Sequence, residues 1–142
     1  MHKLDSVIYT GKATATGGRD GRAESSDGRL KTKLSVPQAM GGDDGDGTNP
    51  EQLFAAGYSA CFIGALKHVA GTQNLKLSND VSVTGEAAIG PIDKGFAIAV
   101  TLTVDLGDMP EADARKLVDA AHEVCPYSNA TRGNIEVDLK LA

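Results

Sequence analysis

Fourteen consecutive residues without a charged side chain, 53–66, restrict the fold of this chain more than any other feature. Asn49 and Pro50 precede them as a suitable N-cap and first helical residue, and Glu51 suits the positive end of a helix dipole. These signals predict a helix over residues 50–70. A helix that is apolar all round is expected to be buried on all sides, and the uncharged stretch is too short to cross a bilayer.

The second half of the chain shows the alternation of apolar and polar residues that is typical of half-buried strands. Residues 96–106 alternate in this way, and so do residues 81–89. The segment 90–95 between them contains Gly and Pro and predicts an antiparallel hairpin with a six-residue loop. Residues 135–141 predict a further strand.

Weaker patterns predict two strands near the start of the chain, over residues 7–16 and 30–36, with a glycine-rich turn at 17–21. A second helix is predicted over residues 110–124, and Pro126 ends it. The apolar stripe of this helix consists of Ala114, Leu117, Val118, Ala121, Val124 and Cys125.

The elements follow in the order strands, buried helix, hairpin, amphipathic helix and strand, which predicts an α+β fold. At this length we expect a single domain over residues 1–142. The net charge of −5 and the aromatic content of 4% argue against nucleic acid as a partner. The polar opening residues lack the apolar region of a signal peptide, so we expect a cytoplasmic protein that has no membrane partner.

Cys61 and Cys125 are the only cysteines. In a reducing compartment they are not expected to form a structural disulfide. Cys61 lies in the middle of the first helix, among Gly and Ala residues that leave room around its sulfur, and Cys125 lies on the core-facing stripe of the second. Both can point inward and meet as a reactive pair. Two buried thiols that pack as small apolar side chains fit the pattern equally well.

The spacing of the candidate ligands does not favour a metal site. Besides the cysteines, the chain has only His2, His68 and His122, and none lies at the spacing of a zinc site. The acidic, glycine-rich segment 41–47 lacks the spacing of a calcium loop. We therefore expect no metal ion.

Arg19 in the glycine turn and Glu51 in the first helical turn have, by pattern alone, the character of solvated side chains. A redox cysteine, however, needs a positive neighbour that holds it as a thiolate. At about 4 Å and an effective dielectric near 20, a unit charge contributes about 4 kcal/mol, or roughly three pKa units. An arginine supplies this charge permanently, and a carboxylate would hold its guanidinium in place.

Three segments, 16–21, 47–62 and 125–134, resemble the organic hydroperoxide resistance (Ohr) proteins of the Ohr/OsmC superfamily. The similarity covers essentially the whole chain, and two of these long motifs surround the only cysteines. The resemblance implies a thiol-dependent peroxidase of the bacterial cytoplasm. It also implies an intertwined α+β homodimer, in which antiparallel sheets pack against long central helices.

The resemblance implies a role for each matched residue. Cys61 would be the peroxidatic cysteine, Cys125 the resolving cysteine, and Arg19 and Glu51 the pair that activates Cys61. Cys61 would become a sulfenic acid and then form a disulfide with Cys125, which dihydrolipoyl groups of a lipoylated protein would reduce. The substrates would be alkyl and fatty-acid hydroperoxides, with no metal, haem or nucleotide cofactor.

An apolar hydroperoxide has to reach Cys61, and we predict Phe54, Ile63 and Tyr127 as walls of its pocket. Other functions remain open for the same residues. They are a non-enzymatic redox sensor, a binder of apolar ligands, and an osmotically induced relative with weak or different peroxidase activity. The chain length and the Cys-Pro-Tyr motif argue against the last of these.

Glu51 and Cys61 lie ten residues apart in the predicted helix. A helix rises 1.5 Å per residue, so about 15 Å separate them along the axis. A glutamate side chain spans only a fraction of this distance. We therefore expect Arg19 and Glu51 to act on Cys61 of the partner subunit in a two-fold dimer.

Overall fold

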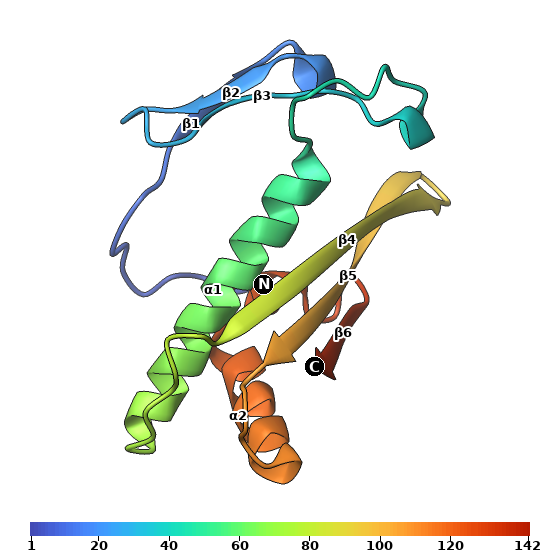
Figure 1. The fold of residues 1–142 in the computed structure, drawn as a ribbon. Coiled ribbons are helices and arrows are strands. Elements are labelled where there is room, and N and C mark those ends of the chain that lie inside the picture. The colour runs from blue at the N-terminus through green and yellow to red at the C-terminus, as the bar shows by residue number, and fades with distance from the viewer. The chain divides into compact units, whose positions relative to one another are not determined.

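The computed structural model describes residues 1–142, and a small antiparallel sheet organises its first unit, Met1–Pro50 (Figure 1). The predicted glycine turn is confirmed, because a short 3₁₀ helix, η1 (Gly18–Asp20), connects the first two strands. Gly17 and Gly18 have φ values of 77° and 63°, a left-handed region that glycine enters readily. The elements of this unit are β1 (Ala13–Thr16), β2 (Arg22–Ser25), β3 (Lys31–Lys33) and η2 (Gln38–Met40), and the strands lie in the order β1-β2-β3.

The early strands are shorter than their sequence patterns predict. Residues 7–12 form no strand, because β-branched residues alone do not make a strand without a neighbour to pair with. Of the predicted strand over residues 30–36, only the middle forms β3. The sequence pattern missed β2, which contains Ala23 as its only apolar residue and therefore shows no alternation. Its pairing with β1 and β3 makes it a strand.

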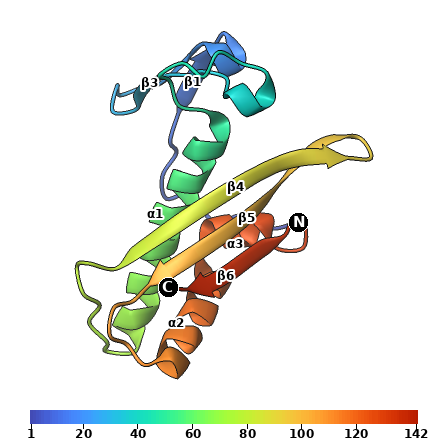
Figure 2. The same cartoon turned by 45° about the vertical axis from the view of Figure 1, so that its right-hand side comes forward.

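A longer three-stranded sheet lies in the second unit, Glu51–Ala142 (Figures 1 and 2). Its strands are β4 (Ser82–Ile92), β5 (Gly95–Asp105) and β6 (Val137–Leu141), in this spatial order. The predicted hairpin of β4 and β5 is confirmed. β6 runs parallel to β5, so this sheet is mixed rather than purely antiparallel. A parallel neighbour needs a long crossover, which the helices between β5 and β6 provide.

The loop of this hairpin is much shorter than the predicted six residues, 90–95. Pro91 pairs with Phe96, and only residues 93–94 connect the two strands. Pro91 is tolerated inside β4 because β4 is an edge strand, where one side of the backbone needs no hydrogen-bond partner in the sheet. Gly95 has a φ of 90°, which a tight turn accommodates best with glycine.

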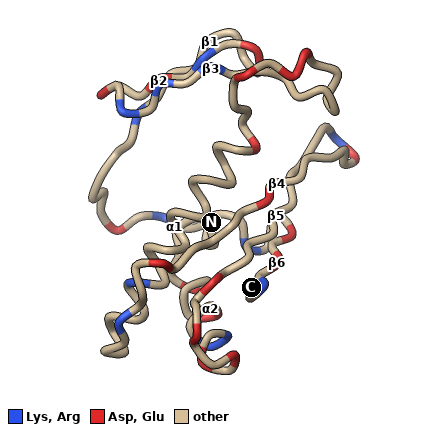
Figure 3. The backbone as a smooth tube through the Cα atoms, viewed as in Figure 1, with Lys and Arg blue, Asp and Glu red and all other residues tan.

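The predicted first helix is confirmed as α1 (Pro50–Thr72), with Pro50 at its first position. Figure 3 shows its central part without charged residues. One face packs in the core with strand β5 and helix α2, through Tyr58, Phe62, Ala65, Leu66, Val69 and Ala70. On another face Ala56, Ala60 and Gly64 are exposed. The expectation of burial on all sides is therefore wrong for the single chain, because its core covers only one face of α1.

By length and composition alone, α1 is able to cross a membrane, with 23 residues and a mean hydropathy of 1.3 over its most apolar window. Its largest side chains, however, lie in a core that also contains Val100, Leu102 and Leu117. This packing is typical of the central helix of a globular protein.

The predicted second helix is confirmed as α2 (Glu111–Val124). Its stripe is buried as predicted, except for Val124, whose side chain is 44% exposed because Cys125 takes the core position at that end. Pro126 ends α2 and also starts a short helix that the sequence pattern missed, α3 (Pro126–Thr131). Proline suits a first helical position as well as a helix end, so its presence did not decide between them.

Candidate active site

The two cysteines lie in contact within the second unit. Cys125 Sγ lies 3.8 Å from Cys61 Sγ, and both thiols are free. Cys61 projects from the middle of α1, and Cys125 lies where α2 ends and α3 begins. Cys125 is fully buried, whereas Cys61 is partly accessible. Since a disulfide bond is about 2.05 Å long, a movement of about 2 Å is enough to join them.

The surroundings of Cys61 do not by themselves favour a thiolate. Burial raises the pKa of Cys61 above its ordinary value, and the neighbouring Cys125 raises it further. A hydrogen bond from the backbone N–H of Tyr127 works in the opposite direction and lowers this pKa. None of these influences is a positive charge. A reactive thiolate at this position therefore needs a cation beside its sulfur.

Helix α3 explains how a backbone N–H comes to face the sulfur of Cys61. The first N–H groups of a helix have no acceptor within the helix. Tyr127 is the second residue of α3, after Pro126. Its N–H is therefore available to the Cys61 sulfur, and the turn that places Cys125 beside Cys61 also brings this donor there.

An apolar cavity of about 440 Å³ lies beside this turn. The rings of Phe54 and Tyr127 lie 5.8 Å apart at its wall, and the ring of Tyr58 lies 5.6 Å from that of Tyr127. Two of the predicted wall residues, Phe54 and Tyr127, line this cavity, and Ile63 does not. The lining residues are Phe54, Ile98, Pro126, Tyr127, Ala130, Thr131, Asn134 and Ile135.

Four polar side chains that the sequence reasoning did not connect form a hydrogen-bonded cluster next to the cysteines. The Tyr58 hydroxyl lies 2.9 Å from Ser128 Oγ and 3.2 Å from Thr131 Oγ1. His122 Nδ1 lies 2.8 Å from Ser128 Oγ. Tyr58 and Ser128 are fully buried. The available signal was a tyrosine on the apolar face of the first helix, since a buried tyrosine hydroxyl usually has a partner.

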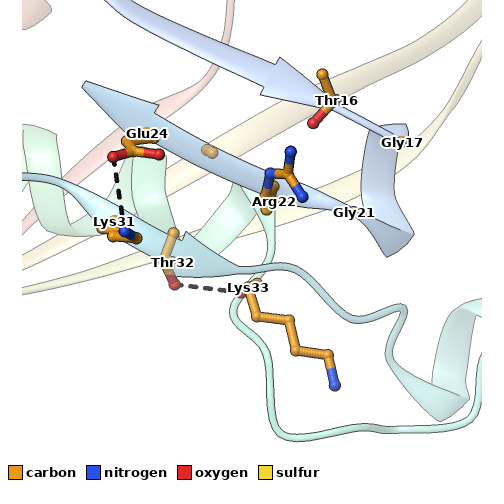
Figure 4. Close-up of a pocket in the computed structure, with 9 residues that line it drawn as sticks. Thr16, Gly17, Gly21, Arg22, Glu24, Lys31, Thr32 and Lys33 are labelled. Carbon is orange, nitrogen blue, oxygen red and sulfur yellow. Dashed lines mark hydrogen bonds and ion pairs between the residues drawn. The ribbon is translucent and has the colours of Figure 1, made fainter. Parts of the chain in front are cut away.

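A second concave surface lies over the sheet of the first unit, with a volume of about 560 Å³ (Figure 4). It is lined by β1, β2, β3 and the turn after β1, and Lys31 and Glu24 form an ion pair of 3.8 Å at its edge. It contains neither cysteine nor histidine. Both thiols of this chain therefore lie outside it.

Arg19 and Glu51, the predicted activating pair, lie on different elements. Arg19 belongs to η1 in the first unit, and Glu51 lies in the first turn of α1. Glu51 and Cys61 do share one helix, as predicted, so the axial separation of about 15 Å applies to the structure as well. No three potential metal ligands among His, Cys, Asp and Glu side chains lie together.

The comparisons with known proteins show the family of this chain. A model of the OsmC-like protein family matches residues 42–140. An organic hydroperoxide resistance protein from Xanthomonas axonopodis pv. citri is 59% identical over the full length of both chains. This chain belongs to the organic hydroperoxide resistance proteins of the OsmC family.

Solved Ohr structures have the same fold. An Ohr protein from Legionella pneumophila is 48% identical, with a TM-score of 0.90 over 96% of this chain and 99% of that chain. An Ohr protein from Vibrio cholerae, solved with captopril in one of its active sites, is 46% identical, with a TM-score of 0.91 over 98% of this chain and 95% of that chain. The predicted α+β fold of the Ohr/OsmC type is thereby confirmed.

Proposed function

We propose that this Ohr protein is a thiol-dependent peroxidase that reduces organic hydroperoxides to alcohols. The contact of two free sulfurs at 3.8 Å, beside an apolar cavity with aromatic walls, is the observation that carries this function. One thiol is partly accessible to a substrate and the other is buried within reach of it. The names of the relatives, which refer to organic hydroperoxide resistance, support the same function.

Cys61 is the nucleophile in this mechanism. Its thiolate attacks one oxygen of the hydroperoxide, an S–O bond forms and the O–O bond breaks. The alkoxide takes up a proton and leaves as the alcohol, and Cys61 becomes a sulfenic acid. The sulfur of Cys125 then attacks the Cys61 sulfur, an S–S bond forms, and the hydroxyl group leaves with the proton of Cys125 as water.

A dithiol completes the cycle by thiol–disulfide exchange. We assign this role to dihydrolipoyl groups on a lipoylated protein, which supply both electrons and leave as the cyclic disulfide. The partial accessibility of Cys61 supports an attack on its sulfur from outside, because Cys125 is fully buried. The two thiols carry out these steps without a metal or another cofactor.

Arg19 and Glu51 activate Cys61 in this mechanism. Because burial raises the pKa of Cys61, its thiolate depends on a nearby cation, and arginine is charged at every relevant pH. Glu51 holds the guanidinium group in a paired geometry. Without this charge, the thiol would stay protonated near neutral pH and react slowly with hydroperoxides.

We assign the active form to a homodimer in which this activating pair serves the partner subunit. Glu51 lies about 15 Å from Cys61 along α1, too far for a direct action on the same chain. The exposed small residues Ala56, Ala60 and Gly64 allow another chain to approach the backbone of α1 closely. We place this dimer in the cytoplasm and treat residues 1–142 as one domain.

A steady-state assay with a dithiol tests the function. Each buried methylene group contributes about 0.8 kcal/mol, so a bulky compound such as cumene hydroperoxide should have a much higher kcat/KM than hydrogen peroxide. The enzyme should consume many equivalents. If consumption stops after one equivalent, the protein is a redox sensor, and comparable kcat/KM values would exclude an apolar substrate site.

A further inference from the structure

The hydrogen-bonded cluster beside the cysteines has one consistent order of donors. Thr131 Oγ1 donates to the backbone carbonyl of Ser128 at 3.2 Å, and a carbonyl oxygen only accepts. The single proton of Thr131 is thereby used, so the Tyr58 hydroxyl donates to Thr131. Ser128 Oγ in turn donates to Tyr58, and His122 Nδ1–H donates to Ser128. This is the only assignment of donors in which all four hydrogen bonds of the cluster form at the same time.

This cluster connects the helices that carry the two thiols. Tyr58 lies three residues before Cys61 on α1, and Ser128 lies three residues after Cys125 on α3. On α1, residues three apart lie on the same face, with Cβ atoms about 5–6 Å apart, and on the other side Cys125 directly precedes the first turn of α3. The bond between Tyr58 and Ser128 therefore joins α1 to α3 about one helical turn away from the contact of the two sulfurs.

Helix α3 needs such an attachment, because a helix of six residues is not stable on its own. It also sets the position of Cys125, which directly precedes it. Disulfide formation requires the sulfurs to approach from 3.8 Å to about 2.05 Å in a defined orientation. If α3 were mobile, its conformational freedom would be lost at that step, at a cost in entropy. Because the cluster already holds α3 on α1, this cost is not added to disulfide formation.

We propose that Tyr58, His122, Ser128 and Thr131 form a hydroxyl clamp that sets how readily Cys61 and Cys125 close into a disulfide. These four are positioning residues, since they act on the sulfurs through the backbone of α3. The catalytic consequence rests on the proposed peroxidase function. In that reaction the clamp favours the step in which Cys125 attacks the sulfenic acid of Cys61 and water leaves. It does not contribute to the earlier cleavage of the peroxide O–O bond.

The direct test is the thiol–disulfide equilibrium of the Cys61–Cys125 pair with glutathione, in the absence of any hydroperoxide. This equilibrium gives the effective concentration of one thiol toward the other. Thr131→Val keeps the side-chain volume and removes two bonds of the clamp. The bond to the carbonyl of Ser128 lies within α3, so only the bond to Tyr58 is lost between α3 and α1. Because one hydrogen bond contributes about 0.5–1.5 kcal/mol, we expect the effective concentration to fall roughly two- to tenfold. Tyr58→Phe should have an effect of similar size.

Thr72→Val is the matched control. It makes the same change on α1 and removes a bond from Thr72 Oγ1 to the carbonyl of Val69, at 2.7 Å, far from the thiols. It should leave the glutathione equilibrium unchanged even if it lowers the thermal stability. A loss of effective concentration in Thr131→Val but not in Thr72→Val therefore separates positioning from general destabilisation.

The order of donors gives a second, spectroscopic test. Nitrogen NMR of the folded protein should show neutral His122 with its proton on Nδ1, and Ser128→Ala should abolish the preference for this tautomer. An unchanged glutathione equilibrium in folded Thr131→Val and Tyr58→Phe would overturn the hydroxyl clamp, as would a proton on Nε2 in the unmodified protein. The glutathione equilibrium and the NMR spectrum are both measured without peroxide turnover. A failure of the hydroxyl clamp can therefore be distinguished from a failure of the proposed peroxidase function.

Discussion

Gly57 faces the phenol ring of Tyr127 so closely that a Cβ atom at position 57 would lie 2.8 Å from the tyrosine hydroxyl oxygen and 3.3 Å from Cζ. Tyr127 lines the apolar cavity, and its backbone N–H bonds to the Cys61 sulfur. The absence of a side chain at Gly57 thus allows the ring of Tyr127 to lie against α1, where it forms a wall of the cavity.

Gly57→Ala should therefore displace the Tyr127 ring and change the cavity. We expect kcat/KM for a bulky organic hydroperoxide to fall severalfold, with little change for hydrogen peroxide. The control is Gly71→Ala on the same helix, where a Cβ atom has no neighbour within 4 Å. This control should gain up to about 1 kcal/mol of stability and keep its kinetics. Equal kcat/KM values for Gly57→Ala and the unmodified protein would show that the ring is not a wall of the substrate site.

Acidification should destabilise the protein through His122. Burial lowers the pKa of His122 below its ordinary value of 6.5, and the charge of Arg132 lowers it further, against weaker opposite effects of Glu123 and Asp119. The unfolded chain then binds the proton more tightly than the folded chain. The contribution of neutral His122 to stability is present above pH 6.5 and is lost as the pH falls through the folded-state pKa.

His122→Asn keeps an N–H donor near the position of Nδ1 and removes the titration. Urea unfolding at pH 8 and at pH 5 should show a smaller loss of unfolding free energy for this variant than for the unmodified protein. His68→Asn, at an exposed position of α1, should retain the full loss. If both variants lose as much stability as the unmodified protein, His122 is not the group responsible.

The proposed action of Arg19 and Glu51 on the partner subunit can be tested by complementation. Cys61→Ser subunits and Arg19→Ala subunits should each be inactive as homodimers. A heterodimer of the two keeps one intact nucleophile and one intact activating pair, and these meet in one site if they act across the dimer. We expect up to half of the unmodified activity in purified heterodimers, and no recovery if the pair serves its own chain.

The main helices and the hairpin could be predicted because their signals are local. An N-cap followed by proline and an uncharged stretch defines α1, and strict alternation defines the hairpin strands. β2 could not be predicted from its own residues, because its two neighbours determine it. The missed helix α3 has a related cause, since proline is compatible both with a helix end and with a helix start.

The site could be predicted only in part. The two cysteines stood out as the only thiols, but their contact depends on how α3 packs on α1 across 64 positions of sequence. The cluster around Ser128 depends on the same packing, because its members come from three helices and no spacing rule connects them. Tertiary contacts of this kind are set by the whole core rather than by a local pattern.

The central claim is that Cys61 reacts first with the hydroperoxide and that Cys125 then resolves it. The most direct test is a single turnover with one equivalent of cumene hydroperoxide, followed by stopped-flow kinetics, thiol titration and intact mass. The unmodified protein should lose both thiols as a disulfide, and Cys61→Ser should not react. Cys125→Ser should react as fast as the unmodified protein and retain one added oxygen atom at Cys61. Equal loss of the first turnover in both variants would contradict the assignment of the two cysteines.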